Sequence, residues 1–93
     1  MKILAVCGMG LGSGLLLRMQ AEKALTKLGI KADVEVCDMG SARAMAATAD
    51  YILTSAELAQ QLGKVKPKVV TISNFIDLNE MVEKLGEALA TPR

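Results

Sequence analysis

Apolar residues in this chain switch repeatedly between two spacings, and that alternation limits the folds open to it. Strand-like runs cover residues 2–6, 30–36, 50–53 and 68–73, and helix-like runs cover about residues 14–28, 54–63 and 77–89. The small residues at 41–49 predict a further short helix or turn. Strands that alternate with helices are typical of βαβ units around a parallel sheet. A chain of 93 residues has room for one such core, so we expect a single domain over residues 1–93.

Local signals mark the expected ends of the helices. Gly29 follows the apolar stripe of the first helix and should end it. Thr54 and Glu57 have the spacing of a capping box, which predicts that a helix begins after Thr54. Asp77 and Glu80 repeat that spacing at the start of the last helix.

The order of the strands follows from the same pattern. The second strand alternates apolar and charged residues and fits a half-exposed edge, whereas the first reads as a buried strand and fits the centre. With right-handed crossovers, we expect an open, Rossmann-like α/β sheet of four parallel strands in the order 2-1-3-4, with helices on both faces. Ligands of such sheets bind beyond the carboxyl ends of the strands, where the strand order reverses. In this chain that point is the segment from Cys7 to Ser13.

Composition excludes several classes of function. Eleven basic and ten acidic residues give a net charge of +1, and Tyr51 and Phe75 are the only aromatic residues. The chain therefore offers neither a basic footprint nor stacking platforms for nucleic acid. The absence of histidine removes Cys-His and Ser-His catalysis within the chain, and two cysteines cannot complete a four-ligand zinc site. We expect no nucleic-acid partner, no metal and no cofactor.

The opening residues lack the apolar region and cleavage site of a secretory signal. No run approaches the ~18 apolar residues that a membrane-spanning helix needs. We therefore expect a cytoplasmic chain that does not insert into a membrane. In that compartment Cys7 and Cys37, which form no C-x-x-C motif, are expected to be free thiols.

Cys7 is followed by a segment in which glycine occupies every second position from Gly8 to Gly14. The dinucleotide and Walker A templates do not fit this segment, because their later glycine and Gly-Lys-Ser/Thr positions are not met. What remains is a cysteine, five residues, Ser13 and then a helix. The candidate phosphate-binding loop consists of Gly8, Met9, Gly10, Leu11, Gly12, Ser13 and Gly14.

Small residues in this loop would let successive backbone N–H groups turn toward one anion, and the N-terminus of the following helix would add its own. Such a cup would hold the oxygens of a phosphoryl group on the Cys7 sulfur. It would also lower the pKa of the Cys7 thiol below the ~8.5 of a free cysteine, whereas Cys37 gains no such partial charges. The alternatives are a buried, inert Cys7 beside a plain turn, and Ser13 as a helix cap without a ligand.

Three further polar residues are expected near the loop. Thr54 and Ser55 end the third strand beside it, where their hydroxyls would either contact the loop or cap the following helix. Cys37 ends the second strand at the same edge of the sheet. There it would either approach Cys7, so that an oxidised pair blocks transfer, or remain an isolated thiol.

Apolar residues around the loop are expected to divide between partner and core contacts. Met9 and Leu11 alternate with the glycines and have few ways to be buried, so they suit an adaptable apolar contact with partner proteins. Leu16 and Met19 follow on the first helix and are expected in the core.

The spacing of Cys7 and Ser13 resembles that of low-molecular-weight protein tyrosine phosphatases, which have a strand, a cysteine, five loop residues and then arginine. Ser13 stands where the arginine would, and the chain has no Asp-Pro dipeptide to supply the general acid of those enzymes. The resemblance implies their fold, but these departures leave hydrolysis poorly supported. A phosphocysteine that is held and not hydrolysed is a carrier.

The stretches ILAVCGMGLGSGLLLRM at residues 3–19 and ADYILTSAELA at residues 49–59 are similar to IIB components of the phosphoenolpyruvate-dependent sugar phosphotransferase system. The likeness is to the lactose and ascorbate types, the ascorbate-specific branch in particular, and spans essentially the whole chain. It implies a phosphotransferase in which Cys7 accepts a phosphoryl group from a histidine of the IIA partner. The group then passes to an ascorbate-like sugar held by the membrane IIC permease. The alternatives are a small cysteine phosphatase or arsenate-reductase-like enzyme, and a noncatalytic anion-sensing regulatory domain.

Overall fold

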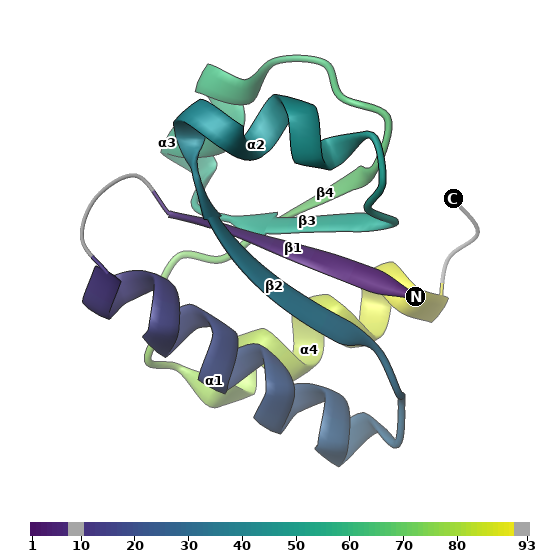
Figure 1. Cartoon of the computed structure of the whole chain (residues 1–93). Helices are drawn as coiled ribbons and strands as arrows, with labels where there is room; N and C mark the ends of the chain where they lie inside the picture. The colour runs from purple at the N-terminus through teal and green to yellow at the C-terminus, as the bar shows by residue number, and fades with distance from the viewer. Residues whose placement is uncertain (8–10, 91–93) are drawn as a thin grey trace.

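The four strands form one parallel sheet in the order β2-β1-β3-β4, which confirms the predicted topology (Figure 1). The computed structural model describes residues 1–7 and 11–90, with side chains for residues 1–7 and 15–90. In chain order the elements are β1 (Lys2–Cys7), α1 (Leu11–Leu28), β2 (Asp33–Asp38), α2 (Met39–Ala46), β3 (Tyr51–Thr54), α3 (Ala56–Leu62), β4 (Lys68–Thr71) and α4 (Leu78–Ala90). Helices α1 and α4 cover one face of the sheet, and α2 and α3 cover the other (Figure 1).

The central strand β1 is buried on both faces, which explains its unbroken apolar sequence. Ile3, Ala5 and Cys7 belong to the core cluster beneath α1 and α4. Leu4 and Val6 belong to the cluster beneath α2 and α3. Alternate residues of β1 thus enter two separate cores, and its last residue emerges at the carboxyl edge of the sheet.

Several element boundaries differ from the prediction. Helix α1 begins at Leu11, earlier than expected, and ends at Leu28, where Gly29 adopts the positive φ of 71° that a glycine stop requires. Strand β2 begins at Asp33, because the chain at residues 30–32 still leads from α1 to the sheet edge. The small-residue stretch forms helix α2, for which the Asp38 side chain accepts a hydrogen bond from the backbone N–H of Ser41 at 2.9 Å.

The capping predictions are confirmed for α4 and wrong by one residue for α3. Ser55, and not Thr54, caps α3: its hydroxyl accepts a hydrogen bond from the backbone N–H of Leu58 at 3.3 Å. Before α4, the Asp77 side chain accepts a hydrogen bond from the backbone N–H of Glu80 at 3.2 Å, as the capping-box spacing predicts.

The Glu80 side chain does not return to its own cap but joins α4 to the segment that follows β4. Its carboxylate accepts hydrogen bonds from the backbone N–H groups of Ser73 at 2.8 Å and Asn74 at 3.0 Å. Lys84 lies 3.6 Å away on the next turn of the helix. The two backbone N–H donors, with Lys84, hold the pKa of the Glu80 carboxyl below its usual range.

We predict that Glu80→Gln lowers the free energy of unfolding at neutral pH. The variant should also lose less of that free energy than the wild-type protein when the pH is lowered. The folded-state pKa of Glu80 lies below the ~4.3 of a free glutamate. The ionised carboxylate therefore contributes to the free energy of unfolding above about pH 4.3, and this contribution is lost as the pH falls through the lowered pKa. Urea unfolding between neutral pH and about pH 3 measures the difference. Glu83→Gln, at an exposed position of the same helix, is the control, and an identical pH dependence in both variants would contradict the assignment.

Candidate functional site

Cys7 is the last residue of β1 and lies at the carboxyl edge of the sheet, where the strand order reverses. Its backbone pairs in register with Asp38 of the edge strand β2. Its side chain is only 6% exposed and belongs to the cluster that contains Leu17 and Ala21 of α1. The thiol therefore faces the side of the sheet that α1 covers, close to the point where the chain passes from strand to helix.

The predicted phosphate-binding loop is divided between two parts of the chain. Gly8, Met9 and Gly10 lie outside the described residues. Leu11, Gly12, Ser13 and Gly14 form the first turn of α1 and are not loop residues. Backbone N–H groups in the first turn of a helix have no intrahelical acceptor and carry the positive end of the helix dipole. The arrangement thus places a helix N-terminus shortly after the cysteine, which is a setting suited to an anion.

The expected low pKa of Cys7 is wrong in direction. Burial raises the pKa of the Cys7 thiol, because the thiolate would lose hydration in the core beneath α1. The pKa of Cys37 is also raised, first by burial and then by the neighbouring Asp38 carboxylate, which agrees with the expectation for that residue. Burial at this position therefore favours the protonated form of the Cys7 thiol.

Cys37 lies on the opposite face of the sheet from Cys7. It pairs in register with Val6, so its side chain points to the same face as Val6, and it packs against the cluster beneath α2 and α3. Cys7 points to the face beneath α1 and α4. Both cysteines are free. Because the two side chains leave the sheet on opposite faces, the structure favours the isolated thiol over an oxidised pair of Cys7 and Cys37.

Thr54 and Ser55 have different roles, although they are neighbours with similar side chains. Ser55 caps α3, as described above. Thr54 is fully buried, and its hydroxyl donates a 2.8 Å hydrogen bond to the backbone carbonyl of Val6. Thr54 thus contacts the peptide group that leads into Cys7, within β1, and the sequence predicted neither this partner nor that Ser55 alone of the two would cap α3.

Three large apolar side chains near the start of α1 are exposed: Leu15 by 56%, Leu16 by 36% and Met19 by 47%. The expectation that Leu16 and Met19 lie in the core is therefore wrong. The buried stripe of α1 runs instead through Leu17 and Ala21. The helical spacing of that stripe already places Leu16 and Met19 outside it, and this signal was available in the sequence.

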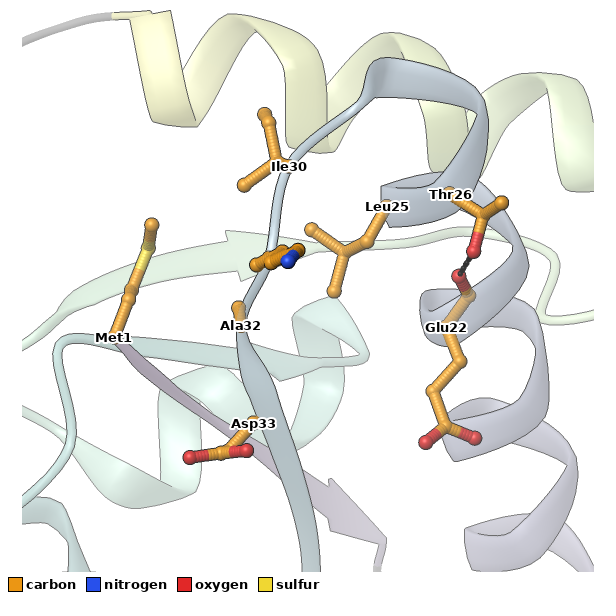
Figure 2. A pocket seen from close by; sticks show the side chains of 8 residues that line it. Met1, Glu22, Leu25, Thr26, Ile30, Ala32 and Asp33 are labelled. Atoms are coloured by element: carbon orange, nitrogen blue, oxygen red, sulfur yellow. Dashed lines mark hydrogen bonds between the residues drawn. The ribbon is translucent and has the colours of Figure 1, made fainter.

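A hollow of about 470 Å³ lies at the other end of the sheet (Figure 2). Met1, Leu25 and Ile30 contribute its apolar lining between the amino ends of the strands and the last turns of α1. The full length of β1 separates it from Cys7, so the hollow is not part of the candidate site.

Neither a membrane span nor a metal cluster occurs within the described part of the chain. No helix there is long and apolar enough to cross a membrane. Residues 1–7 and 11–90 also contain no group of three or more His, Cys, Asp or Glu side chains placed to hold a metal ion.

Comparisons with known proteins agree on one family. The family of lactose/cellobiose-specific IIB subunits of the phosphotransferase system matches residues 2–87. The ascorbate-specific EIIB component of Mycoplasma pneumoniae is 35% identical over 88 residues, which cover 94% of this chain and 93% of that protein. The corresponding proteins of Shigella sonnei and Escherichia coli O157:H7 are 33% and 32% identical over 89 residues, which cover 95% of this chain and 88% of each protein. The lactose-specific IIB domain from Streptococcus pneumoniae matches the fold with a TM-score of 0.62 at 15% identity, over 100% of this chain and 98% of that domain.

The raised thiol pKa values predict how the two cysteines react with iodoacetamide. Because only the thiolate reacts, both rates should rise with pH and reach half of their maximum above the ~8.5 of a free thiol. Alkylation of the reduced protein across pH, with each site read by peptide mass, measures both values in one sample. The same protein in urea supplies the unshifted reference. If Cys7 in the folded protein reaches half of its maximal alkylation rate at a lower pH than in urea, then backbone N–H groups, and not burial, determine the pKa of its thiol.

Proposed function

The chain belongs to the lactose/cellobiose-specific IIB family of the sugar phosphotransferase system, and on this premise we propose that it carries a phosphoryl group on Cys7. The observation that carries the proposal is the position of Cys7 at the carboxyl end of the central strand, immediately before the segment that leads into α1. IIB components act as phosphotransferases between a IIA protein and a membrane IIC protein. Cys7 is the residue of this chain best suited to that task.

The first transfer takes the phosphoryl group from a phosphohistidine of the IIA partner. The N–P bond breaks, an S–P bond forms on Cys7, and the proton of the Cys7 thiol ends on the imidazole nitrogen that has lost the phosphoryl group. The raised pKa of Cys7 makes this exchange important, because the thiol is protonated before the partner arrives. The departing imidazole is itself a base of suitable strength, with a pKa near ~6.5 in its free form. The chain, which has no histidine, then needs no base of its own.

The second transfer passes the group to the sugar. The S–P bond breaks, an O–P bond forms on a sugar hydroxyl, and the proton of that hydroxyl restores the Cys7 thiol. Between the two steps the phosphoryl oxygens require hydrogen-bond donors. We assign this task to the backbone N–H groups of Gly8, Met9 and Gly10 and of the first turn of α1, residues 11–14, with the Ser13 hydroxyl as a further donor. No cofactor or metal enters either step.

A carrier must keep its phosphoryl group from water, and the sequence favours this over hydrolysis. Ser13 stands where related phosphatases have arginine, and no Asp-Pro dipeptide supplies a general acid. A small phosphatase or arsenate-reductase-like enzyme would need both the arginine and the general acid. A noncatalytic anion-sensing domain would need no nucleophile at all. These alternatives predict different products from one incubation.

The deciding incubation combines the protein with phosphoenolpyruvate, the general phosphotransferase proteins and a matching IIA protein. A carrier retains a stable label on Cys7 until sugar and IIC are added. A phosphatase releases inorganic phosphate instead, and a sensing domain neither takes up label nor releases phosphate. The three relatives named above that match in sequence are ascorbate-specific EIIB components, so ascorbate with an ascorbate-type IIC is the first acceptor to test. In this scheme the chain works at the cytoplasmic side of the membrane.

We predict that Cys7→Ser abolishes phosphoryl acceptance and leaves the fold intact. A serine hydroxyl is nearly isosteric with the thiol but is a far weaker nucleophile at neutral pH without an adjacent base. Cys37→Ser is the matched control, because Cys37 lies on the other face of the sheet and should retain normal acceptance. Labelling of Cys7→Ser at the wild-type rate, or loss of labelling in Cys37→Ser alone, would contradict the assignment.

We also predict that the exposed apolar side chains of Leu16 and Met19 contact the phosphorylated IIA donor. They lie on α1 close to the end that follows Cys7, and such side chains adapt readily to a partner surface. The double variant Leu16→Gln, Met19→Gln should raise the KM for phosphorylated IIA about tenfold, which corresponds to about 1.4 kcal/mol of lost contact, with kcat little changed. Lys27→Gln, in the last turn of the same helix, is the control. An unchanged KM in the double variant would place the partner elsewhere.

A further inference from the structure

The two strands that flank β1 support its last residues in different ways. On the β2 side the backbone register continues through Val6↔Cys37 to Cys7↔Asp38. On the β3 side it covers Ile3↔Tyr51, Leu4↔Ile52 and Ala5↔Leu53 and ends there. Backbone pairing with β3 thus stops two residues before the cysteine, because the chain turns at Ser55 to begin α3.

The Thr54 hydroxyl spans the place where this pairing ends. It donates a 2.8 Å hydrogen bond to the carbonyl oxygen of Val6, and the side chain is fully buried. The Val6 carbonyl and the Cys7 nitrogen belong to one planar peptide group, so a bond that fixes the first also fixes the plane of the second. A hydroxyl at this position therefore substitutes for the missing backbone donor on the β3 side of Cys7.

Thr54 is itself held by hydrogen bonds on its other side, where β3 pairs with β4. Its backbone carbonyl accepts a 2.9 Å hydrogen bond from the N–H of Ile72, and its backbone pairs in register with Thr71 of β4. Hydrogen bonds thus run from Ile72 to Thr54 and from Thr54 to the peptide group before Cys7. These two hydrogen bonds connect the end of β4, the end of β3 and the peptide group before Cys7 in β1.

We propose that Thr54 is a positioning residue for phosphoryl transfer, which acts by holding the Val6–Cys7 peptide group so that the Cys7 sulfur meets the incoming phosphorus in line. This inference rests on the proposed function of Cys7 as phosphoryl acceptor. Phosphoryl transfer depends on the alignment of attacking and leaving atoms, and a displacement of about 1 Å can slow a positioned reaction about a hundredfold. Thr54 contacts no reacting atom itself, and its effect passes through the backbone.

The test compares Thr54→Val, which replaces the hydroxyl by a methyl group of similar size, with Thr54→Ser, which keeps the hydroxyl. We expect Thr54→Val to lower kcat for phosphoryl acceptance from phosphorylated IIA about tenfold or more with little change in KM. Thr54→Ser should recover most of that rate. Ile3→Val, near the start of β1, is the control for lost stability, because it removes a buried methyl group far from Cys7.

Three results would overturn the inference: Thr54→Val with the wild-type kcat, Thr54→Ser as slow as Thr54→Val, or a similar loss of kcat in Ile3→Val. If Thr54→Val does not fold, as judged by circular dichroism, Thr54→Ala takes its place under the same criteria. Failure of the proposed function has a separate signature, since the wild-type protein itself would then accept no phosphoryl group on Cys7.

Discussion

The burial of β1 on both faces is the constraint on which the rest of the structure depends. Because Ile3, Ala5 and Cys7 enter one core and Leu4 and Val6 the other, a shift of the strand by one residue would exchange the two sets. The register that satisfies both cores therefore also fixes which face receives Cys7. The thiol comes to lie at the carboxyl edge, beneath the first half of α1, as a consequence of packing along the whole strand.

This placement gives the cysteine a protected and uncharged resting state. Burial raises the pKa of its thiol, so in the proposed transfer the proton would leave during the reaction and not before it. In the transfer that we propose, the imidazole that leaves the donor would supply the base, and the same burial would limit attack by water on a phosphorylated Cys7. Cys37, although adjacent in the sheet, is separated from this chemistry because it points to the other face.

The sequence was sufficient for the strand order, the edge position of β2 and the helix stop at Gly29, since these depend on spacing and on a backbone conformation that few other residues adopt. It was insufficient where neighbouring residues share the same chemistry. Thr54 and Ser55 both carry hydroxyls at a strand end, and only the register of β3 against β1 decides that one caps a helix and the other holds the Val6 carbonyl. The pKa of Cys7 was misjudged because local partial charges can be inferred from sequence, whereas burial depends on how α1 and α4 cover the sheet.

The central claim, that a phosphoryl group rests on the sulfur of Cys7, is tested most directly by phosphorus NMR of the wild-type protein after incubation with phosphorylated IIA and without sugar. The chemical shift distinguishes phosphorus bonded to sulfur from phosphorus bonded to nitrogen or oxygen. We predict one persistent S–P resonance, which disappears when Cys7 has been alkylated beforehand. A signal from N–P or O–P bonds on this protein, or from inorganic phosphate alone, would contradict the account.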